Sequence, residues 1–176
     1  MSPEELTRRA RRVQWLLLDV DGVLTDGRLH YRGDGEELLS FDIKDGHGVK
    51  LARQTGLAVA VLSGRASGAA ERRARDLGVD DLVLGRNDKG PAFAELLARH
   101  QLAAEAVAAI GDDLQDLPIL LRCGLSFAPA DAVAEVRGAV HHVLASPAGR
   151  GAVREMVETL LRARGAWDDL LADLRR

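Results

Sequence analysis

Leu16-Leu17-Leu18-Asp19-Val20-Asp21-Gly22-Val23-Leu24-Thr25 is the stretch that decides the fold of this chain. It predicts a buried apolar strand, from Trp15 to Val20, that delivers Asp19 and Asp21 into a turn loosened by Gly22. Burying anionic groups beside apolar residues is costly unless a cation or hydrogen-bond donors meet them. The stretch therefore indicates a chemical site, and its residues suggest a carboxylate nucleophile beside a hard metal ion.

The composition limits the domain count and the kinds of partner. The 176 residues are 47% hydrophobic and 29% charged, with a net charge of -3, which predicts one domain over residues 1–176. The slight negative charge and the 3% aromatic content argue against nucleic acid or a membrane surface as a partner. The N-terminus lacks a secretory signal and no apolar run approaches the roughly 20 residues of a membrane helix, so we expect a cytoplasmic location.

Apolar strands alternate with helical segments along the rest of the chain. This alternation predicts an α/β fold in which helices cover both faces of a parallel sheet. Two short extended pieces around the turn Arg32-Gly33-Asp34-Gly35 predict a β-hairpin over residues 28–42. Further strands are expected at 57–62, 81–84, 106–110, 125–127 and 141–144, and further helices at 46–54, 66–77, 88–100, 114–122 and 151–164.

Polar residues follow four of the expected strands at the point where each strand ends. Ligands of open parallel sheets bind at the carboxyl ends of the strands, so these side chains are expected to share one crevice. Any one of them alone is more often a turn or helix cap, but together they favour a divalent cation, and oxygen ligands favour Mg²⁺. Carboxylates, Mg²⁺ and a lysine suit phosphoryl transfer. The residues are Asp19, Asp21, Ser63, Lys89, Asp112 and Asp113.

The ordered set Asp19-x-Asp21-Gly22-Val23-Leu24-Thr25, Ser63, Lys89 and Gly111-Asp112-Asp113-x-x-Asp116 resembles the four motifs of the haloacid dehalogenase superfamily of phosphatases. The resemblance covers most of the chain. It implies a Rossmann-like three-layer sandwich whose parallel sheet has the order 5-4-1-2-3, with Asp19 beside Asp112.

The same resemblance implies a role for each motif residue. Asp19 would be the nucleophile that forms an aspartyl-phosphate, and Asp21 the general acid and then the general base. Ser63 would hydrogen-bond the phosphoryl oxygens, and Lys89 would offset negative charge. Mg²⁺ would be held by the carboxylates of Asp19 and Asp112 and the backbone carbonyl of Asp21, with Asp113 and Asp116 orienting or supplementing these ligands.

The spacing of the motifs leaves no room for a cap domain. About 40 residues separate Asp21 from Ser63 and about 26 separate Ser63 from Lys89. This layout, with the motifs Thr25-Asp26-Gly27, Lys44-Asp45-Gly46-x-Gly48, Leu62-Ser63-Gly64-Arg65 and Gly149-Arg150-Gly151-Ala152-Val153-Arg154-Glu155, is similar to a capless group of sugar-phosphate phosphatases. The group acts on 3-deoxy-manno-octulosonate 8-phosphate in lipopolysaccharide sugar biosynthesis, or on nine-carbon keto acid phosphates.

Members of this capless group are homotetramers in which hairpins pair around a central axis and a neighbouring tail covers each site. The tail, residues 165–176, accordingly carries an apolar stripe at helical spacing that we interpret as a packing surface, with a partner subunit as the expected contact. The stripe is formed by Trp167, Leu170, Leu171 and Leu174.

Substrate contacts are less sharply indicated than the motif residues. Arg65 is expected either to bind substrate or to pair with an acid, and Arg150, with Arg154 one turn on, is either a surface arginine or a ligand of a substrate carboxylate or phosphate. Cys123 is expected to be a buried, unreactive thiol. The full set of expected substrate contacts is Thr25, Lys44, His47, Gly64, Arg65 and Arg150.

Three other functions remain open at this point. A phosphatase for 2-keto-3-deoxynononate 9-phosphate or a related sialic-acid-type substrate is the nearest one. A non-catalytic oligomerisation module is disfavoured because every motif residue is intact. A phosphate-accepting receiver domain is disfavoured because Asp21 is placed to speed hydrolysis of the acyl phosphate.

Overall fold

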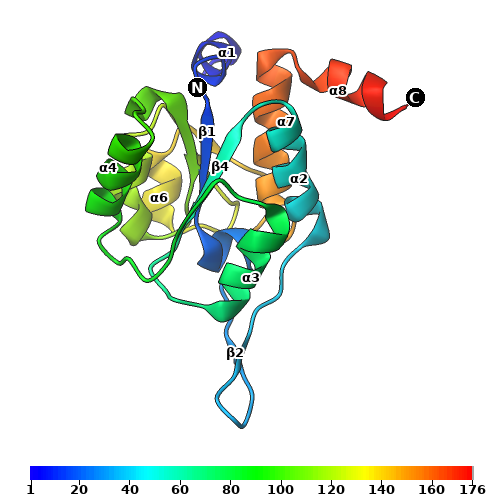
Figure 1. Ribbon diagram of the computed structural model, residues 1–176. Helices are drawn as coiled ribbons and strands as arrows, with labels where there is room; N and C mark the ends of the chain where they lie inside the picture. The colour runs from blue at the N-terminus through cyan, green and yellow to red at the C-terminus, as the bar shows by residue number, and fades with distance from the viewer. Residues whose placement is uncertain (176) are drawn as a thin grey trace.

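A six-stranded parallel sheet forms the centre of the computed structural model, which describes residues 1–175 (Figure 1). The sheet has the order β5-β4-β1-β6-β7-β8, while β2 and β3 form a separate hairpin. When the six strands of the large sheet are renumbered 1 to 6 in chain order, their order across the sheet, starting from β8, is 6-5-4-1-2-3. This is the predicted order with one strand added at the edge. The strands are β1 (Trp15–Leu18), β4 (Ala58–Leu62), β5 (Asp81–Val83), β6 (Val107–Ile110), β7 (Leu125–Ala128) and β8 (His142–Val143).

The central strands are apolar on both sides because both faces of the sheet are covered. Successive side chains of a strand point to opposite faces, so Leu16 and Leu18 of β1 join one core layer and Leu17 joins the other. In the same way, Val59 of β4 lies in the first layer and Ala60 in the second. This explains why the expected strands read as continuous apolar runs rather than alternating patterns.

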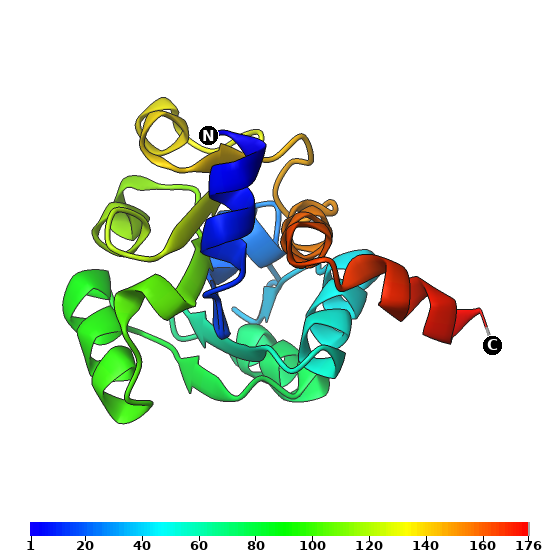
Figure 2. The ribbon, with the colours of Figure 1, turned by 90° about the horizontal axis from the view of Figure 1, so that it is seen from above.

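Helices cover both faces of the sheet in a three-layer arrangement (Figure 2). The first core layer includes buried residues of α2, α3 and α7, and the second includes those of α4, α5 and α6. The helices are α1 (Pro3–Ala10), α2 (Ile43–Gln54), α3 (Gly68–Leu77), α4 (Lys89–Arg99), α5 (Leu117–Leu120), α6 (Ala134–Ala139), α7 (Ala152–Arg164) and α8 (Trp167–Leu174).

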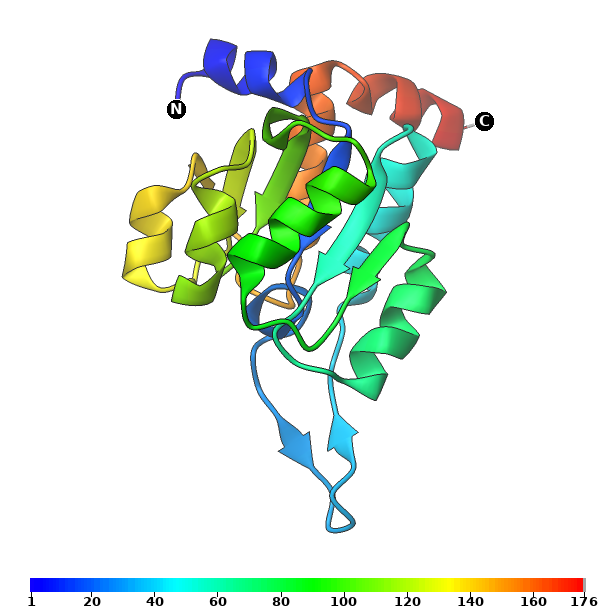
Figure 3. The same cartoon turned by 60° about the vertical axis from the view of Figure 1, so that its left-hand side comes forward.

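The hairpin projects beyond the carboxyl ends of the strands, away from the rest of the molecule (Figure 3). Its strands β2 (His30–Tyr31) and β3 (Glu37–Leu38) pair antiparallel, with Tyr31 opposite Glu37. The amide of Gly35 donates to the carbonyl of Arg32 at 2.9 Å, and Gly35 has a φ of 87° that favours glycine. The turn thus forms at the expected sequence.

Some element boundaries differ from those expected. Strand β1 ends at Leu18, two residues early, because the chain enters a wide turn at Val20–Leu24. Helix α2 begins at Ile43 rather than at residue 46, because the Asp42 carboxylate caps it by accepting from the amide of Lys44 at 2.6 Å. Cys123 is buried and burial raises the pKa of its thiol to about 12, which confirms the predicted unreactive cysteine.

The C-terminal segment forms α8, at the opposite end of the molecule from the hairpin (Figure 1). The ring of Trp167 is buried beneath the guanidinium groups of Arg154 and Arg162, which lie 5.6 Å and 4.8 Å from its centre. Leu170 and Leu171 pack against the first core layer. The apolar stripe expected in the tail therefore packs on its own chain at Trp167, Leu170 and Leu171. The side chain of Leu174 and all of Arg176 lie outside the described residues.

Among residues 1–175, no helix is long and apolar enough to cross a membrane.

Helix α7 starts against a buried carboxylate from α2. Asp45 is 1% exposed and accepts hydrogen bonds from the amides of Gly151 at 3.1 Å and Arg154 at 2.8 Å. Helix amides at this position lack partners within their own helix. Asp45 thus ties the two helices that cover the first face of the sheet.

Replacing this carboxylate should lower the stability of the fold. We expect Asp45→Ala to reduce the free energy of unfolding by about 2–3 kcal/mol, because two helix amides lose a charged acceptor. Urea denaturation followed by circular dichroism would measure the loss. Asp76→Ala is the matched control, since Asp76 forms an exposed pair with Arg72; an equal loss in both variants would contradict the capping role.

Candidate active site

The turn after β1 brings two carboxylates to the carboxyl edge of the sheet. The amide of Thr25 donates to the carbonyl of Val20 at 3.0 Å and closes the turn. Gly22 has a φ of 80°, and a Cβ atom on it would lie 2.0 Å from Oδ2 of Asp112. Only glycine fits here, because the side chain of Asp112 approaches this turn so closely.

Lys89 lies buried between two carboxylates, with 4% of its side chain exposed. Its ammonium is 2.8 Å from Oδ2 of Asp19 and 2.6 Å from Oδ1 of Asp116. The other oxygen of Asp19 accepts from the amide of Val20 at 2.7 Å. Lys89 is the first residue of α4, so the start of that helix sets the position of the ammonium. The arrangement holds Asp19 in a fixed orientation.

Asp116 organises the loop after β6. Its Oδ2 accepts from the amides of Asp112 at 3.0 Å and Asp113 at 3.3 Å, while its other oxygen binds Lys89. Asp113 caps the following short turn, accepting from the amide of Leu114 at 2.7 Å. Both oxygens of Asp116 are therefore occupied, which suits a residue that orients its neighbours.

These residues line a cleft of about 240 Å³ at the carboxyl ends of β1, β4 and β6. Five of the lining residues are carboxylates and two are cations, so the cleft has a strong negative field. Of the predicted site residues, the structure brings these to the cleft: Asp19, Asp21, Ser63, Gly64, Arg65, Lys89, Asp112, Asp113 and Asp116.

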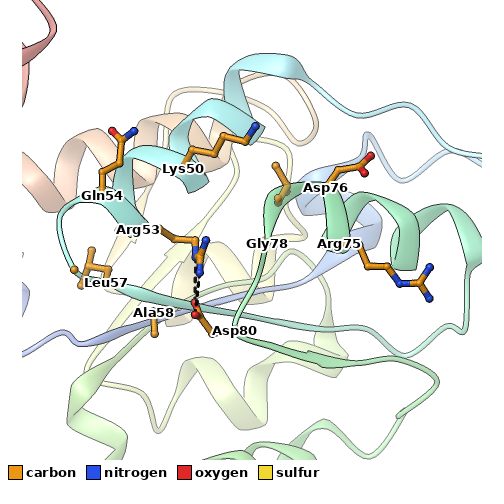
Figure 4. Close-up of a pocket in the computed structure, with 11 residues that line it drawn as sticks. Lys50, Arg53, Gln54, Leu57, Ala58, Arg75, Asp76, Gly78 and Asp80 are labelled. Carbon is orange, nitrogen blue, oxygen red and sulfur yellow. Dashed lines mark hydrogen bonds and ion pairs between the residues drawn. The ribbon is translucent and has the colours of Figure 1, made fainter.

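A larger hollow of about 730 Å³ lies at the other end of the sheet, between α2 and α3 (Figure 4). Arg53 and Asp80 form an ion pair across its floor, at 3.0 Å. Arg75 is paired with Glu71 on its own helix. Four of its five charged residues thus take part in ion pairs, Asp76 with Arg72, and none of the motif residues lines it.

The cleft has the features of a divalent cation site. Oxygens of Asp19, Asp112 and Asp116 lie within 4.8 Å of one another. Oδ1 of Asp112 and Oδ1 of Asp21 are buried without a hydrogen-bond partner among the described residues. Unpartnered buried carboxylate oxygens are costly, and a hard cation would satisfy them. The residues present therefore fit a bound Mg²⁺ ion.

Asp112 and Asp19 in the cleft resist ionisation. Burial raises the pKa of Asp112 to about 7, and the negative charges of Asp19 and Asp116 add to the effect. Burial also raises the pKa of Asp19, although the ammonium of Lys89 works in the opposite direction. Raised carboxyl pKa values with specific charged partners are typical of functional sites.

Ser63 and Arg65 follow β4 at the rim of the cleft. Ser63 is buried, and its hydroxyl accepts from the amide of Arg65 at 3.2 Å. Nε of Arg65 lies 3.2 Å from Oδ2 of Asp21, and the same guanidinium also contacts Glu37. Of the two roles expected for Arg65, pairing with an acid is the one present in this structure.

Four predicted substrate contacts do not line the cleft. The hydroxyl of Thr25 is buried and donates to the carbonyl of Val20 at 3.3 Å. Lys44 and His47 lie exposed on α2. Arg150 is exposed before the start of α7. Within one copy of the chain these residues remain predictions.

The cleft also contains residues that the sequence did not single out. Asn87 and Gln115 line its mouth, and a Cβ atom on Gly64 would lie 2.7 Å and 3.3 Å from their amide oxygens. Glu37 reaches the rim from the hairpin. Asn87 and Gln115 lie close in the sequence to Lys89 and Asp116, and this closeness could have indicated that their amides are near the site. Nothing in the hairpin sequence marks Glu37.

Comparison with known proteins agrees with this geometry. Residues 81–156 match the family described as haloacid dehalogenase-like hydrolase. The 3-deoxy-D-manno-octulosonate 8-phosphate phosphatase of Haemophilus influenzae is 44% identical over 160 residues, covering 91% of this chain and 89% of that protein.

Two solved structures of such phosphatases have the same fold. The enzyme from Yersinia pestis superposes with a TM-score of 0.91 at 39% identity, covering 94% of this chain and 89% of that one. The enzyme from Moraxella catarrhalis, in complex with a magnesium ion, a phosphate ion and a KDO molecule, gives a TM-score of 0.94 at 31% identity, covering 97% and 98%.

Raising the pH should destabilise the metal-free protein and strengthen the effect of Mg²⁺. The folded cleft keeps protons that the unfolded chain releases near pH ~4, so this contribution to stability is lost as the pH rises from there through about 7. A bound cation replaces those protons, so saturating Mg²⁺ should raise the melting temperature more above pH 7 than below it. Differential scanning calorimetry with and without Mg²⁺ would measure both effects.

The matched variant for this measurement is Asp112→Asn, which keeps the shape of the side chain and removes its charge. Its melting temperature should respond weakly to Mg²⁺ at either pH. An Mg²⁺ response in the unmodified protein that is equal on both sides of neutrality would contradict the metal site described above.

Proposed function

We propose a reaction for this chain on the basis of its family. The chain belongs to the haloacid dehalogenase-like hydrolases, and within them to the 3-deoxy-D-manno-octulosonate 8-phosphate phosphatases. The chain is a single phosphatase domain that hydrolyses 3-deoxy-D-manno-octulosonate 8-phosphate to the free sugar acid and phosphate, a step of lipopolysaccharide sugar biosynthesis. The observation that carries the proposal is the buried Asp19–Lys89–Asp116 cluster beside Asp21 and Asp112.

The first half of the reaction transfers the phosphoryl group to the protein. An oxygen of Asp19, oriented by Val20 and Lys89, attacks phosphorus, and the bond between phosphorus and the sugar oxygen breaks. Protonated Asp21 donates its proton to the departing oxygen and is left as a carboxylate. The product at this stage is an aspartyl-phosphate together with the free sugar acid.

The second half returns Asp19 to its starting state. Asp21, now ionised, takes a proton from a water molecule, whose oxygen attacks phosphorus and releases phosphate from Asp19. Ser63 at the rim hydrogen-bonds the phosphoryl oxygens, and Lys89 offsets their charge. The carboxylates of Asp19 and Asp112 and the carbonyl of Asp21 would hold Mg²⁺, which would supply further neutralisation of the phosphoryl group.

The shape of the cleft suits the phosphate end of a larger molecule. Its volume of about 240 Å³ is small, and among residues 1–175 no cap domain covers it. The sugar would therefore extend beyond the carboxylates, over the rim formed by Gly64 and Arg65. Thr25, Lys44, His47 and Arg150 remain candidate substrate contacts whose reach depends on how copies of the chain assemble.

Assembly into a homotetramer is part of this proposal. The hairpin and the residue that follows it expose apolar side chains that a single copy leaves uncovered, and Ile43 is 83% exposed. Exposed apolar groups on a projecting element favour a protein interface. The other exposed apolar residues of the segment are Leu29, Tyr31 and Leu38. The cytoplasmic location inferred from the sequence remains a prediction.

Removing the nucleophile should abolish turnover without unfolding the protein. We expect Asp19→Asn to lower kcat on 3-deoxy-D-manno-octulosonate 8-phosphate by at least roughly a thousandfold, because an amide cannot form the acyl phosphate. Phosphate release would be measured on this substrate and on 2-keto-3-deoxynononate 9-phosphate, with and without a chelator. Asp76→Asn is the control.

The substrate panel separates the rival functions. Equal or faster turnover of the nine-carbon acid by the unmodified protein would overturn the proposed substrate. No turnover of any phosphate ester would favour an oligomerisation module. Retention of even a tenth of the activity by Asp19→Asn would show that Asp19 is not the nucleophile.

The hairpin should control the mass of the protein in solution. Charged residues at its exposed apolar positions, as in Tyr31→Glu combined with Leu38→Glu, should convert the tetramer to smaller species because the interface would bury unpaired charge. Sedimentation velocity would report the mass. Leu121→Glu is the control, since Leu121 is 66% exposed and belongs to a different surface; a monomeric unmodified protein would contradict the assembly.

A further inference from the structure

We propose that Glu37 of the hairpin is a positioning residue of the reaction, which holds the guanidinium of Arg65 against the carboxylate of Asp21. The inference rests on the proposed function, because the general-acid role of Asp21 belongs to it. It adds a residue outside the four motifs and gives the hairpin a role in the chemistry of its own chain.

Both carboxylate oxygens of Glu37 are engaged at the base of the hairpin. One contacts Nη2 of Arg65, and the other accepts from the hydroxyl of Ser67 at 2.7 Å. The side chain of Glu37 is 22% exposed, whereas that of its neighbour Glu36 is 58% exposed and pairs with Arg32 near the hairpin turn. Glu37 therefore faces the body of the molecule, unlike the other acid beside it.

Arg65 links this carboxylate to the cleft. Its Nε is 3.2 Å from Oδ2 of Asp21, and its backbone amide donates to Ser63 at 3.2 Å. Among the described residues, Arg65 is the ion-pair partner of Asp21, whose Oδ1 has no hydrogen-bond partner. The orientation of the Asp21 carboxylate therefore depends on where the guanidinium lies.

A guanidinium on a loop needs a second contact to stay in one place. Arginine loses substantial side-chain entropy when it is fixed, and a planar group held from two sides keeps one orientation. Glu37 supplies the second side, and Ser67 in turn fixes Glu37. Small displacements of a catalytic group are costly, since about 1 Å can lower a rate by about a hundredfold.

The inference predicts a loss that depends on the leaving group. A sugar alkoxide needs a proton from Asp21 to depart, whereas p-nitrophenolate leaves readily without one. Misplacing Asp21 should therefore slow the first half of the reaction, release of the leaving group, much more for the sugar phosphate than for p-nitrophenyl phosphate. The second half, in which Asp21 activates water, is common to both esters. Loss of stability or of assembly would slow both esters equally.

The experiment compares Glu37→Gln with the matched control Glu36→Gln in the full-length protein. Glu37→Gln should lower the single-turnover rate of leaving-group release from 3-deoxy-D-manno-octulosonate 8-phosphate by roughly tenfold or more, with a change in KM of about twofold at most and a loss of about twofold at most in the same rate on p-nitrophenyl phosphate. Glu36→Gln should leave both rates unchanged. The ratio of the two rates in one sample does not depend on the folded fraction, so reduced folding cannot imitate the result.

A double-variant cycle tests whether Glu37 acts through Arg65. Arg65→Lys alone and Arg65→Lys with Glu37→Gln should give the same single-turnover rate on the sugar phosphate, because Glu37 has nothing left to position. The inference would be overturned if the losses multiplied in the double variant, if both esters lost rate equally, or if the Glu37→Gln enzyme were as fast as the control. An unmodified protein that hydrolyses neither ester would overturn the proposed function itself, which is a different result.

Discussion

The buried ammonium of Lys89 is the interaction on which the rest of the site depends. Five carboxylates converge at one edge of the sheet, and two of them, Asp19 and Asp116, are buried. Without a cation among them, neither the folded loops nor an ionised Asp19 would be stable, because like charges repel strongly at low dielectric. Lys89 contacts Asp19 from the turn after β1 and Asp116 from the loop after β6, so it joins two strand ends. Breaking such a buried pair by removing one partner is strongly destabilising.

Sheet topology explains why these groups meet. Strand β1 pairs with β4 on one side and β6 on the other, so the loops after all three strands open at the same place. The side chain of Asp112 lies against Gly22, and a Cβ atom on Gly111 would lie 2.4 Å from Asp116. The two glycines thus allow the loops to approach each other closely, and the carboxylates follow from that approach. The chemistry is set by backbone packing as much as by the acidic side chains.

The core of the site could be read from the sequence because its residues sit at strand ends, where chain order and spatial order coincide in a parallel sheet. That is why Asp19, Ser63, Lys89 and Asp112 were found together. Glu37 could not be found this way, since β3 has two residues and its reach into the cleft depends on how the hairpin folds back. Lys44 and His47 do not line the cleft of one copy: the Asp42 cap starts α2 at Ile43 and both side chains lie exposed on that helix, so their contact with substrate stays a prediction. Trp167 of the tail is buried between arginines of its own chain, and the expected contact of the tail with another subunit stays a prediction.

The opposite positions of α8 and the hairpin constrain how the cleft can be closed. Helix α8 lies at the end of the molecule away from the hairpin, so in this structure it cannot cover the cleft of its own chain. The hairpin base, by contrast, contacts the cleft directly through Glu37 and Arg65. Any copy of the chain that packs on the exposed apolar residues of the hairpin therefore packs on an element tied to Asp21. The segment 28–42 thus joins two features of this architecture, an exposed apolar surface near its turn and a contact with the cleft at its base.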